Sequence, residues 1–144
     1  YDVPVIAMHW DRDRDTGKDI IAEIKRFFER TLKIADSAGI SRSKLILDPG
    51  FGFNKDIAEN YEILRRLAEL TSFGLPILAG TSRKRMIGNL LDVPPEDRAV
   101  GTSATSVLAY ERGAHIFRVH DVRANRDALR VAEACLYGPP QTES

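Results

Sequence analysis

The stretch Lys44–Lys55 constrains the fold of this chain more than any other; it reads Lys-Leu-Ile-Leu-Asp-Pro-Gly-Phe-Gly-Phe-Asn-Lys. Its apolar residues 45–47 are typical of a strand that is buried on both faces. Pro49 has a fixed φ and no amide proton to donate, so the strand must end at Asp48. Two glycines then allow sharp turns, and two phenylalanines place rings in a loop. The pattern fits either a tight turn packed on the core or a loop that binds a flat ligand.

The size and charge of the chain narrow the class of protein. Its 144 residues suffice for one domain, and its 21 Lys and Arg residues balance its 21 Asp and Glu residues. A net charge of zero argues against binding to nucleic acid or to a membrane surface. The sequence also lacks the run of about 18 apolar residues that a membrane helix needs. We therefore expect neither nucleic acid nor membrane among the partners.

Cys135 is the only cysteine, which excludes an internal disulfide and a metal site built from several cysteines. Its neighbours Val131, Ala132 and Leu136 predict a buried thiol on a helix rather than a nucleophile. A free thiol, together with the lack of a signal-peptide pattern, indicates a cytoplasmic protein.

Apolar periodicity predicts four strands that alternate with helices, which is an α/β fold. The predicted order is a buried strand 3–8, helix 20–38, strand 45–47, helix 57–70, strand 74–80, a short helical turn 86–91, helix 97–112 with its start at Pro95 or Asp97, strand 115–119 and helix 124–136. The helix at 97–112 has a face of small residues that suits close packing, formed by Gly101, Thr102, Ser103, Ala104 and Ser106. Such alternation implies right-handed crossovers and a parallel sheet. Two architectures fit equally well at this point: an open doubly wound sheet and part of a (β/α) barrel.

Polar side chains gather at the carboxyl ends of the predicted strands. Met8-His9, Asp48, Ser82-Arg83-Lys84 and the group Arg118, His120 and Asp121 each follow a strand. Parallel strands place these ends on one rim, where both candidate architectures bind their ligands. Each group also has a structural alternative; Arg118, for example, could pair with Asp121. The opposite rim shows nothing comparable, so we interpret the polar rim as a ligand site.

The residue types on this rim limit the ligand. A carboxylate beside a lysine suits a heterocycle with adjacent donors and acceptors, such as an amino-oxo pyrimidine ring. An arginine can stack on such a ring, and Arg118, His120 and the turn at Ser82 can bind phosphate oxygens. The sequence offers no His or Cys spacing that predicts a metal held by protein side chains.

Three motifs resemble the dihydropteroate synthase family: Asp48–Phe53 with Lys55, Gly80–Lys84, and Arg118–Val122. Their order and intervals match the carboxyl-terminal half of that family. The resemblance implies four β/α units with parallel strands, the second half (units 5–8) of a TIM (β/α)8 barrel. Residues 1–137 would form this pterin-binding half-barrel, and residues 138–144 a flexible tail.

The resemblance also implies roles for individual residues. The pterin would contact Met8, Asp48, Gly52, Lys84 and Arg118; p-aminobenzoate would contact Phe53 and Ser82; and the diphosphate would be held by Arg118 and His120. Lys84, Arg118 and His120 would be the catalytic residues. The implied reaction condenses 6-hydroxymethyl-7,8-dihydropterin diphosphate with p-aminobenzoate to give 7,8-dihydropteroate and pyrophosphate. Mg²⁺ is implied as well, with its ligand in the half of the family that this chain does not match, so no residue here is expected to bind metal.

Half a barrel would expose apolar surface on its inner face. We therefore expect a partner: the missing amino-terminal half, or a second copy that closes the barrel. The family resemblance adds a homodimer, with the helices at 97–112 and 124–136 as candidate interface. The chain alone is predicted to be inactive. Two alternatives stay open, a non-catalytic half-barrel that binds pterin or anions, and the pterin-binding domain of a folate-dependent methyltransferase.

Overall fold

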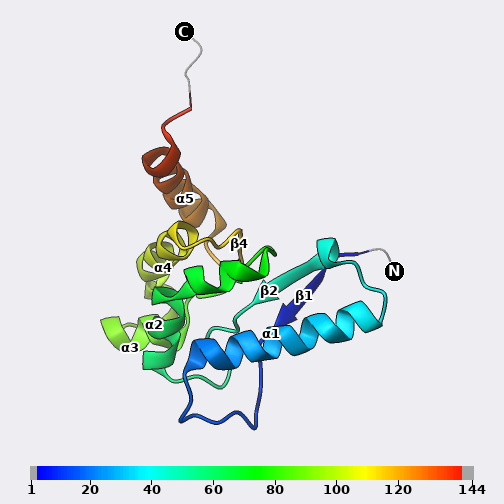
Figure 1. Ribbon diagram of the computed structural model, residues 1–144. Helices are drawn as coiled ribbons and strands as arrows, with labels where there is room; N and C mark the ends of the chain where they lie inside the picture. The colour runs from blue at the N-terminus through cyan, green and yellow to red at the C-terminus, as the bar shows by residue number, and fades with distance from the viewer. Residues whose placement is uncertain (1–2, 141–144) are drawn as a thin grey trace.

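The computed structural model of the protein describes residues 3–140, in which strands alternate with helices (Figure 1). The strands are β1 (Val5–Met8), β2 (Leu45–Asp48), β3 (Leu78–Ala79) and β4 (Ile116–Phe117). The α-helices are α1 (Ile20–Ser37), α2 (Ile57–Arg65), α3 (Arg85–Leu91), α4 (Ala99–Glu111) and α5 (Val122–Tyr137). Short 3-10 helices are η1 (Arg42–Lys44), η2 (Leu67–Phe73) and η3 (Pro95–Asp97). The α/β prediction is confirmed.

The strands follow one another in space in the order in which they occur in the chain. β1 pairs with β2 in parallel, with Met8 opposite Asp48, and β3 pairs with β4 in parallel. A parallel bridge between Leu47 and Ile77 joins the two pairs. All strand ends therefore share one rim, as the sequence predicts, and the loops that follow β1 to β4 meet there.

The core lies between the strands and the helices α1 and α2. Helix α1 begins at Asp19, whose carboxylate accepts a hydrogen bond from the amide of Ala22 at 2.8 Å. The fully buried apolar side chains of this core include Ile21, Ile24, Phe28, Leu47, Phe51, Ile63, Leu67, Leu70 and Ile77. Replacing a ring such as Phe28 by alanine would cost about 3–5 kcal/mol, so this layer anchors β2 and the loop behind it.

Several elements are shorter than predicted. The helix expected at 57–70 ends at Arg65, and η2 continues the chain. The hydroxyls of Thr71 and Ser72 bond backbone carbonyls three residues earlier, which competes with α-helical bonding. β3 is reduced to two residues because Pro76 lacks an amide proton, and the amide of Ile77 donates to the His115 ring at 3.4 Å. β4 is equally short, because it pairs with the two residues of β3.

The small residues of helix α4 allow close packing, as the sequence predicts. A Cβ added to Gly101 would lie only 2.4 Å from Cγ2 of Ile87 in α3. On the side toward α5, the hydroxyl of Ser106 donates to the amide oxygen of the buried Asn125 at 2.8 Å. These contacts fix the third and fourth β/α units against each other.

Two predictions of burial were wrong. The strand at 3–8 was expected to be buried, but Val3, Val5 and Ile6 are exposed, Ile6 by 53%. In the described residues β1 has only β2 beside it, so its other edge lies open. Cys135 is also exposed, because α5 runs on beyond α4 and its last turns project from the body (Figure 1). Helix α5 ends at Tyr137, and residues 141–144 of the expected tail lie outside the described part of the chain.

Candidate functional site

The carboxyl ends of the strands enclose a pocket of about 310 Å³, which we call the strand-end pocket. It is lined by Met8, Asp48, Phe53, Gly80, Ser82, Lys84, Arg118, Val119 and His120. The set contains every residue to which the family resemblance gives a role except Gly52, which lines a neighbouring pocket. The residues come from four separate loops, and the parallel register of the strands brings them together.

Asp48 is the only acidic side chain among the residues that line the strand-end pocket. Its Oδ1 accepts a hydrogen bond from the amide of Gly50 at 2.7 Å, so the carboxylate caps the turn as well as facing the pocket. Burial raises the pKa of Asp48, although the Gly50 amide and the charges of Lys84, Lys55 and Arg118 act in the opposite direction. Within residues 3–140 its second oxygen, Oδ2, makes no hydrogen bond and is free to accept one from a ligand.

The loop after β2 separates its two phenylalanines. Phe51 is fully buried in the core, whereas Phe53 is 38% exposed and lines the pocket. Gly50 has a φ of +72°, and a Cβ there would lie 2.1 Å from the main-chain oxygen of His9. Glycine is therefore required at this position. One ring thus packs on the core, as the first reading of this loop predicts, and the other lines the pocket, where the binding of a flat ligand stays a prediction.

Lys84 reaches back from the start of α3 to this loop. Its Nζ lies 4.7 Å from the centre of the Phe53 ring and donates to the main-chain oxygen of Phe51. Gly52 leaves room for the lysine, because a Cβ there would lie 3.1 Å from its Cδ. Burial lowers the pKa of Lys84, and Asp48 opposes the shift. The lysine therefore places a desolvated positive charge beside Asp48 and Phe53.

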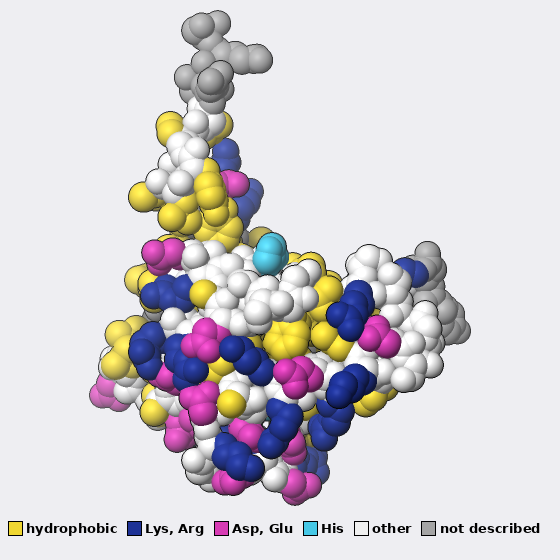
Figure 2. All heavy atoms as spheres, in the orientation of Figure 1, with side chains coloured by type: hydrophobic (Ala, Val, Ile, Leu, Met, Phe, Trp, Pro, Cys, Tyr) yellow, Lys and Arg dark blue, Asp and Glu magenta, His cyan; other side chains and the backbone are white. Residues whose placement is uncertain are grey.

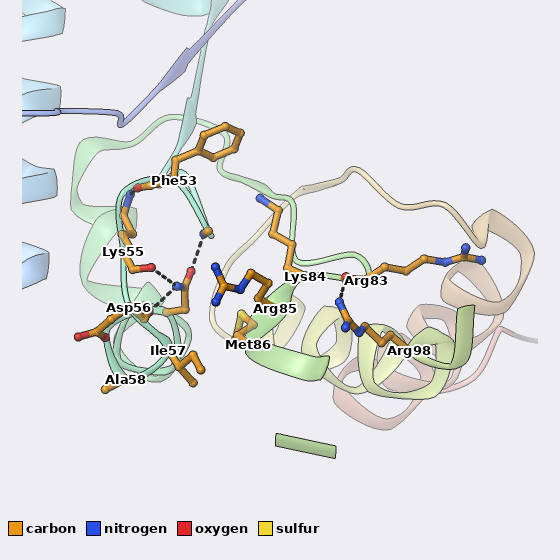
Figure 3. A pocket seen from close by; sticks show the side chains of 12 residues that line it. Phe53, Lys55, Asp56, Ile57, Ala58, Arg83, Lys84, Arg85, Met86 and Arg98 are labelled. Atoms are coloured by element: carbon orange, nitrogen blue, oxygen red, sulfur yellow. Dashed lines mark hydrogen bonds between the residues drawn. The ribbon is translucent and has the colours of Figure 1, made fainter. Parts of the chain in front are cut away.

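A larger cavity of about 730 Å³, which we call the basic pocket, shares Phe53 and Lys84 with the strand-end pocket (Figure 3). Its charged lining residues are Lys55, Arg83, Lys84, Arg85 and Arg98, against the single acid Asp56. Arg98 is held by the main-chain oxygens of Val93 and Arg83, at 3.1 and 2.9 Å. Arg85 makes no hydrogen bond or ion pair with any residue of the range 3–140. The pocket therefore favours a negatively charged group.

Side chains tie the loops after β3 and β4 together. Ser82 Oγ lies 2.8 Å from Nδ1 of His120 and accepts a hydrogen bond from the amide of His120 at 3.0 Å. Arg83 donates two hydrogen bonds to Asp121, at 3.1 and 2.8 Å, and thereby lowers the pKa of that carboxyl. The sequence left open a pair between Arg118 and Asp121. In the structure Asp121 pairs with Arg83 instead, and Arg118 remains exposed at the pocket.

Sequence reasoning missed Asn60. This buried residue of α2 accepts a hydrogen bond from the amide of Gly52 at 2.6 Å and donates to the main-chain oxygen of Asp56 at 2.6 Å. It therefore ties the turn at Gly52 to the first turn of α2. The only signal in the sequence is an amide side chain one turn into the helix that follows the loop.

His9 does not take part in the pocket that its position at a strand end suggested. Its ring is 1% exposed and packs edge-on against Phe27, with centroids 5.1 Å apart. Burial, and then the charges of Lys55 and Arg14, lower the pKa of His9 to about 4. The ring is therefore neutral at physiological pH and belongs to the core.

Comparison with known proteins agrees with this arrangement of residues. Residues 1–120 match the family model described as pterin binding enzyme. The chain belongs to the pterin-binding enzyme family. It is 46% identical over 140 residues to dihydropteroate synthase of Escherichia coli strain K12, which covers 93% of this chain and 50% of the relative. The chain thus spans about half the length of the curated relatives it matches.

Solved structures of the family show the same fold. Dihydropteroate synthase of Xanthomonas albilineans, solved with 4-aminobenzoic acid, is 45% identical with a TM-score of 0.90, covering 95% of this chain and 50% of that one. The same enzyme in complex with 7,8-dihydropteroate is 44% identical with a TM-score of 0.89, covering 95% and 53%. The four β/α units correspond to the second half of a TIM barrel, so the comparison decides between the two architectures that periodicity left open.

Proposed function

We propose that this chain is the carboxyl-terminal half of a dihydropteroate synthase. With a complete barrel it condenses 6-hydroxymethyl-7,8-dihydropterin diphosphate with p-aminobenzoate, giving 7,8-dihydropteroate and pyrophosphate. The observation that carries the proposal is the convergence of Asp48, Lys84 and Arg118 on one pocket. Identity of 46% to the Escherichia coli synthase supports it.

The pterin fits the strand-end pocket by its chemistry. Asp48 has a free oxygen that accepts hydrogen bonds from the amino and ring N–H groups of the pterin edge. Lys84 donates to the carbonyl and N5 side, and Arg118 stacks on the flat ring. Met8, opposite Asp48 in the sheet, lines the slot, and Gly52 lets Lys84 approach.

The p-aminobenzoate is placed beside Phe53 and Ser82. Phe53 and Lys84 line both pockets, so an aryl acid that begins in the strand-end pocket can extend toward the basic pocket. The unpaired guanidinium of Arg85 suits the carboxylate of that acid. Ser82 acts through its hydrogen bond to His120, which keeps the two loops at a fixed spacing.

The reaction needs charge stabilisation more than a strong base. The bond from the pterin methylene carbon to the diphosphate oxygen breaks with both electrons on the leaving group, and the arylamine nitrogen then forms the new bond to carbon and loses a proton. Arg118 and His120 hold the diphosphate, and Lys84 stabilises charge on the pterin ring. The desolvated cation Lys84, beside the exposed Arg118, suits this dissociative course.

The side chains present do not fit the Mg²⁺ that the family implies. In the described part of the chain, no group of three or more His, Cys, Asp or Glu residues converges to hold a metal ion. The strand-end pocket offers the single carboxylate of Asp48 among cations, and that carboxylate is assigned to the pterin. No step of the proposed reaction is therefore routed through a metal.

Exposed apolar surface supports a protein partner. Hydrophobic side chains gather on α5, where Val122, Val131 and Tyr137 are exposed, Tyr137 by 77% (Figure 2). The open edge of β1 is exposed as well. We assign the edge of β1 to a missing amino-terminal half, or to a second copy that replaces it, and the α4–α5 surface to a homodimer. No helix in the described residues is both long and apolar enough to span a membrane.

Activity of the chain with and without a complementary half tests the proposal. Residues 1–144 are expected to form no pteroate alone, and to form it when the amino-terminal half of the Escherichia coli relative is co-expressed. Pterin binding without turnover in both preparations would favour the non-catalytic half-barrel. Turnover by the chain alone would show that the missing half is dispensable. Light scattering of the same samples measures the oligomer.

A further inference from the structure

Lys55 is a half-buried cation for which the proposed reaction has no role. Its Nζ donates to three main-chain oxygens, those of Gly50 and Phe53 at 2.9 Å each and that of His9 at 3.4 Å. In Figure 3 the Lys55 side chain runs toward the backbone of Phe53. An ammonium group has three protons, so the three carbonyls use its full donor capacity.

Two of the acceptors, Gly50 and Phe53, belong to the loop that follows Asp48 at the end of β2, and the third, His9, follows the end of β1. The loop after β2 has positive φ at Gly50, Gly52 and Asn54, and its own backbone closes it with one turn bond, from the amide of Phe53 to the oxygen of Gly50 at 3.1 Å. Lys55 adds the contacts that hold both sides of this turn and fasten it to the end of β1. Without its ammonium group, three carbonyl oxygens would lose this partner, and two of them belong to the buried residues His9 and Gly50.

Lys55 also acts on Asp48 through its charge. The cations that face Asp48 are Lys84, Lys55 and Arg118, which come from the loops after β3, β2 and β4. On its other side Lys55 faces the cation Arg14 and the carboxylate Glu59, which form an ion pair at 2.5 Å. Burial, and then Arg14, lower the pKa of Lys55 to about 8, so the lysine is still largely charged at neutral pH. Asp48 thus depends on Lys55 both for its position and for part of the field that keeps it ionised.

We propose that Lys55 is the positioning residue of this site: its ammonium group fixes the loop that aims Asp48 and Phe53, and its charge keeps Asp48 in the acceptor-only form. The consequence for pterin binding rests on the proposed function. The effect on Asp48 itself does not, because it requires no ligand. The two can therefore be tested separately.

The first measurement is a carboxyl-carbon NMR titration of residues 1–144, with the Asp48 signal assigned by its loss in Asp48→Asn. Lys55→Met should raise the midpoint of the Asp48 titration by about half a pH unit or more, because one of three stabilising cations is gone. Lys55→Arg keeps the charge and should leave the midpoint near that of the wild type. Lys25→Met is the matched control, since Lys25 pairs with Glu69 at 3.2 Å and lines neither pocket.

The second measurement is the affinity for 6-hydroxymethyl-7,8-dihydropterin as a function of pH. Lys55→Met should weaken binding about tenfold at pH 7.5. It should also raise the acid limit of binding, the pH below which pterin affinity is lost, by as much as it raises the Asp48 midpoint. Lys55→Arg should weaken binding without moving the acid limit, because a planar guanidinium cannot reproduce the three carbonyl contacts. Circular dichroism shows whether each variant is folded.

The outcomes separate the inference from the proposed function. An unchanged Asp48 midpoint in folded Lys55→Met overturns the assignment, as does an unchanged pterin affinity in folded Lys55→Arg. If Lys55→Met does not fold, the Lys55→Arg affinity decides. If the wild-type chain, completed by the amino-terminal half, binds no pterin but the Asp48 midpoint moves as expected, the role of Lys55 holds and the proposed function fails at this site.

Discussion

Two groups of charged side chains in this protein differ in how their charges are balanced. On the outer surface, Arg66 bonds Asp19 at 2.5 Å, Glu69 at 2.6 Å and Glu62 at 3.2 Å, and Lys25 also reaches Glu69. In the strand-end pocket, a single carboxylate faces several cations, and in residues 3–140 Asp48 forms no ion pair within 4 Å. The surface group is satisfied by the protein itself, whereas the pocket has an excess of positive charge that a ligand can use.

The directions of the pKa shifts express the same difference. Hydrogen bonds within the surface group lower the pKa of Asp19 and Glu69 and raise that of Arg66, so each partner stabilises the charged form of the other. In the pocket, burial raises the pKa of Asp48 and lowers that of Lys84, so each shift disfavours the charged form. Ionisable groups whose charged form is disfavoured by burial are typical of functional sites. Surface charges that stabilise one another are typical of structural ion pairs.

Removing a cation from the pocket should have the largest effect. Lys84→Ala or Arg118→Ala in the completed barrel should lower turnover at least about a hundredfold, because each cation is placed where charge develops in the reaction. Circular dichroism spectra should remain those of the wild type. Unfolding of either variant would instead indicate that the residue stabilises the fold, as the surface ion pairs do.

Asp48→Asn should cost about 1–3 kcal/mol of pterin binding, since one acceptor becomes a donor that faces the donors of the pterin edge. Calorimetry with 6-hydroxymethyl-7,8-dihydropterin measures the loss. Asparagine can still cap the turn through the Gly50 amide, so the fold is expected to survive. A variant with wild-type affinity would refute the role of Asp48 in pterin binding.

Acid should destabilise the protein through His9. The pKa of His9 is about 4 in the folded protein and 6.5 in the reference state, so below pH 6.5 the unfolded chain takes up a proton that the folded protein does not. The free energy of unfolding should fall as pH drops from about 6.5 to about 4, by about 3 kcal/mol at most, since one pKa unit corresponds to about 1.4 kcal/mol. Denaturant titrations of His9→Leu should lack this slope, while the exposed His115→Leu control should keep it. Equal slopes in the wild type and His9→Leu would contradict the assignment.

The smallest effect is expected in the surface group. Arg66→Ala should leave pterin binding unchanged and lower Tm by about 3 °C or less, because exposed ion pairs are strongly screened by solvent. The effect should shrink further in high salt. A loss of pterin affinity in this variant would remove the distinction between the two groups.

The sequence predicts this site well where the signal lies in residue type and strand position. Asp48 after a buried strand and Lys84 after the next one could be placed on one rim because parallel strands end together. The role of Lys55 could not be predicted in this way, since its partners are main-chain oxygens that every residue possesses. Asn60 was missed for a related reason, because its partner is the amide of a glycine.

Burial was harder to predict than order along the chain. Periodicity placed Cys135 on a buried stripe of its helix, but α5 is longer than the neighbour that covers it. The alternation in the loop after β2 could not tell which phenylalanine packs inward, because that depends on the sharp turn at Gly50. Such features depend on what lies beside a segment, and the sequence of the segment alone does not contain that information.

The open edge of β1 has a consequence for any strand that pairs with it. Because Met8 lies level with Asp48, a parallel strand added to that edge in continuing register would end at the same height, about 4.8 Å away. Its last side chains would then enter the strand-end pocket beside Met8. The exposed strand therefore sets in advance where a complementary chain must place its own polar residues.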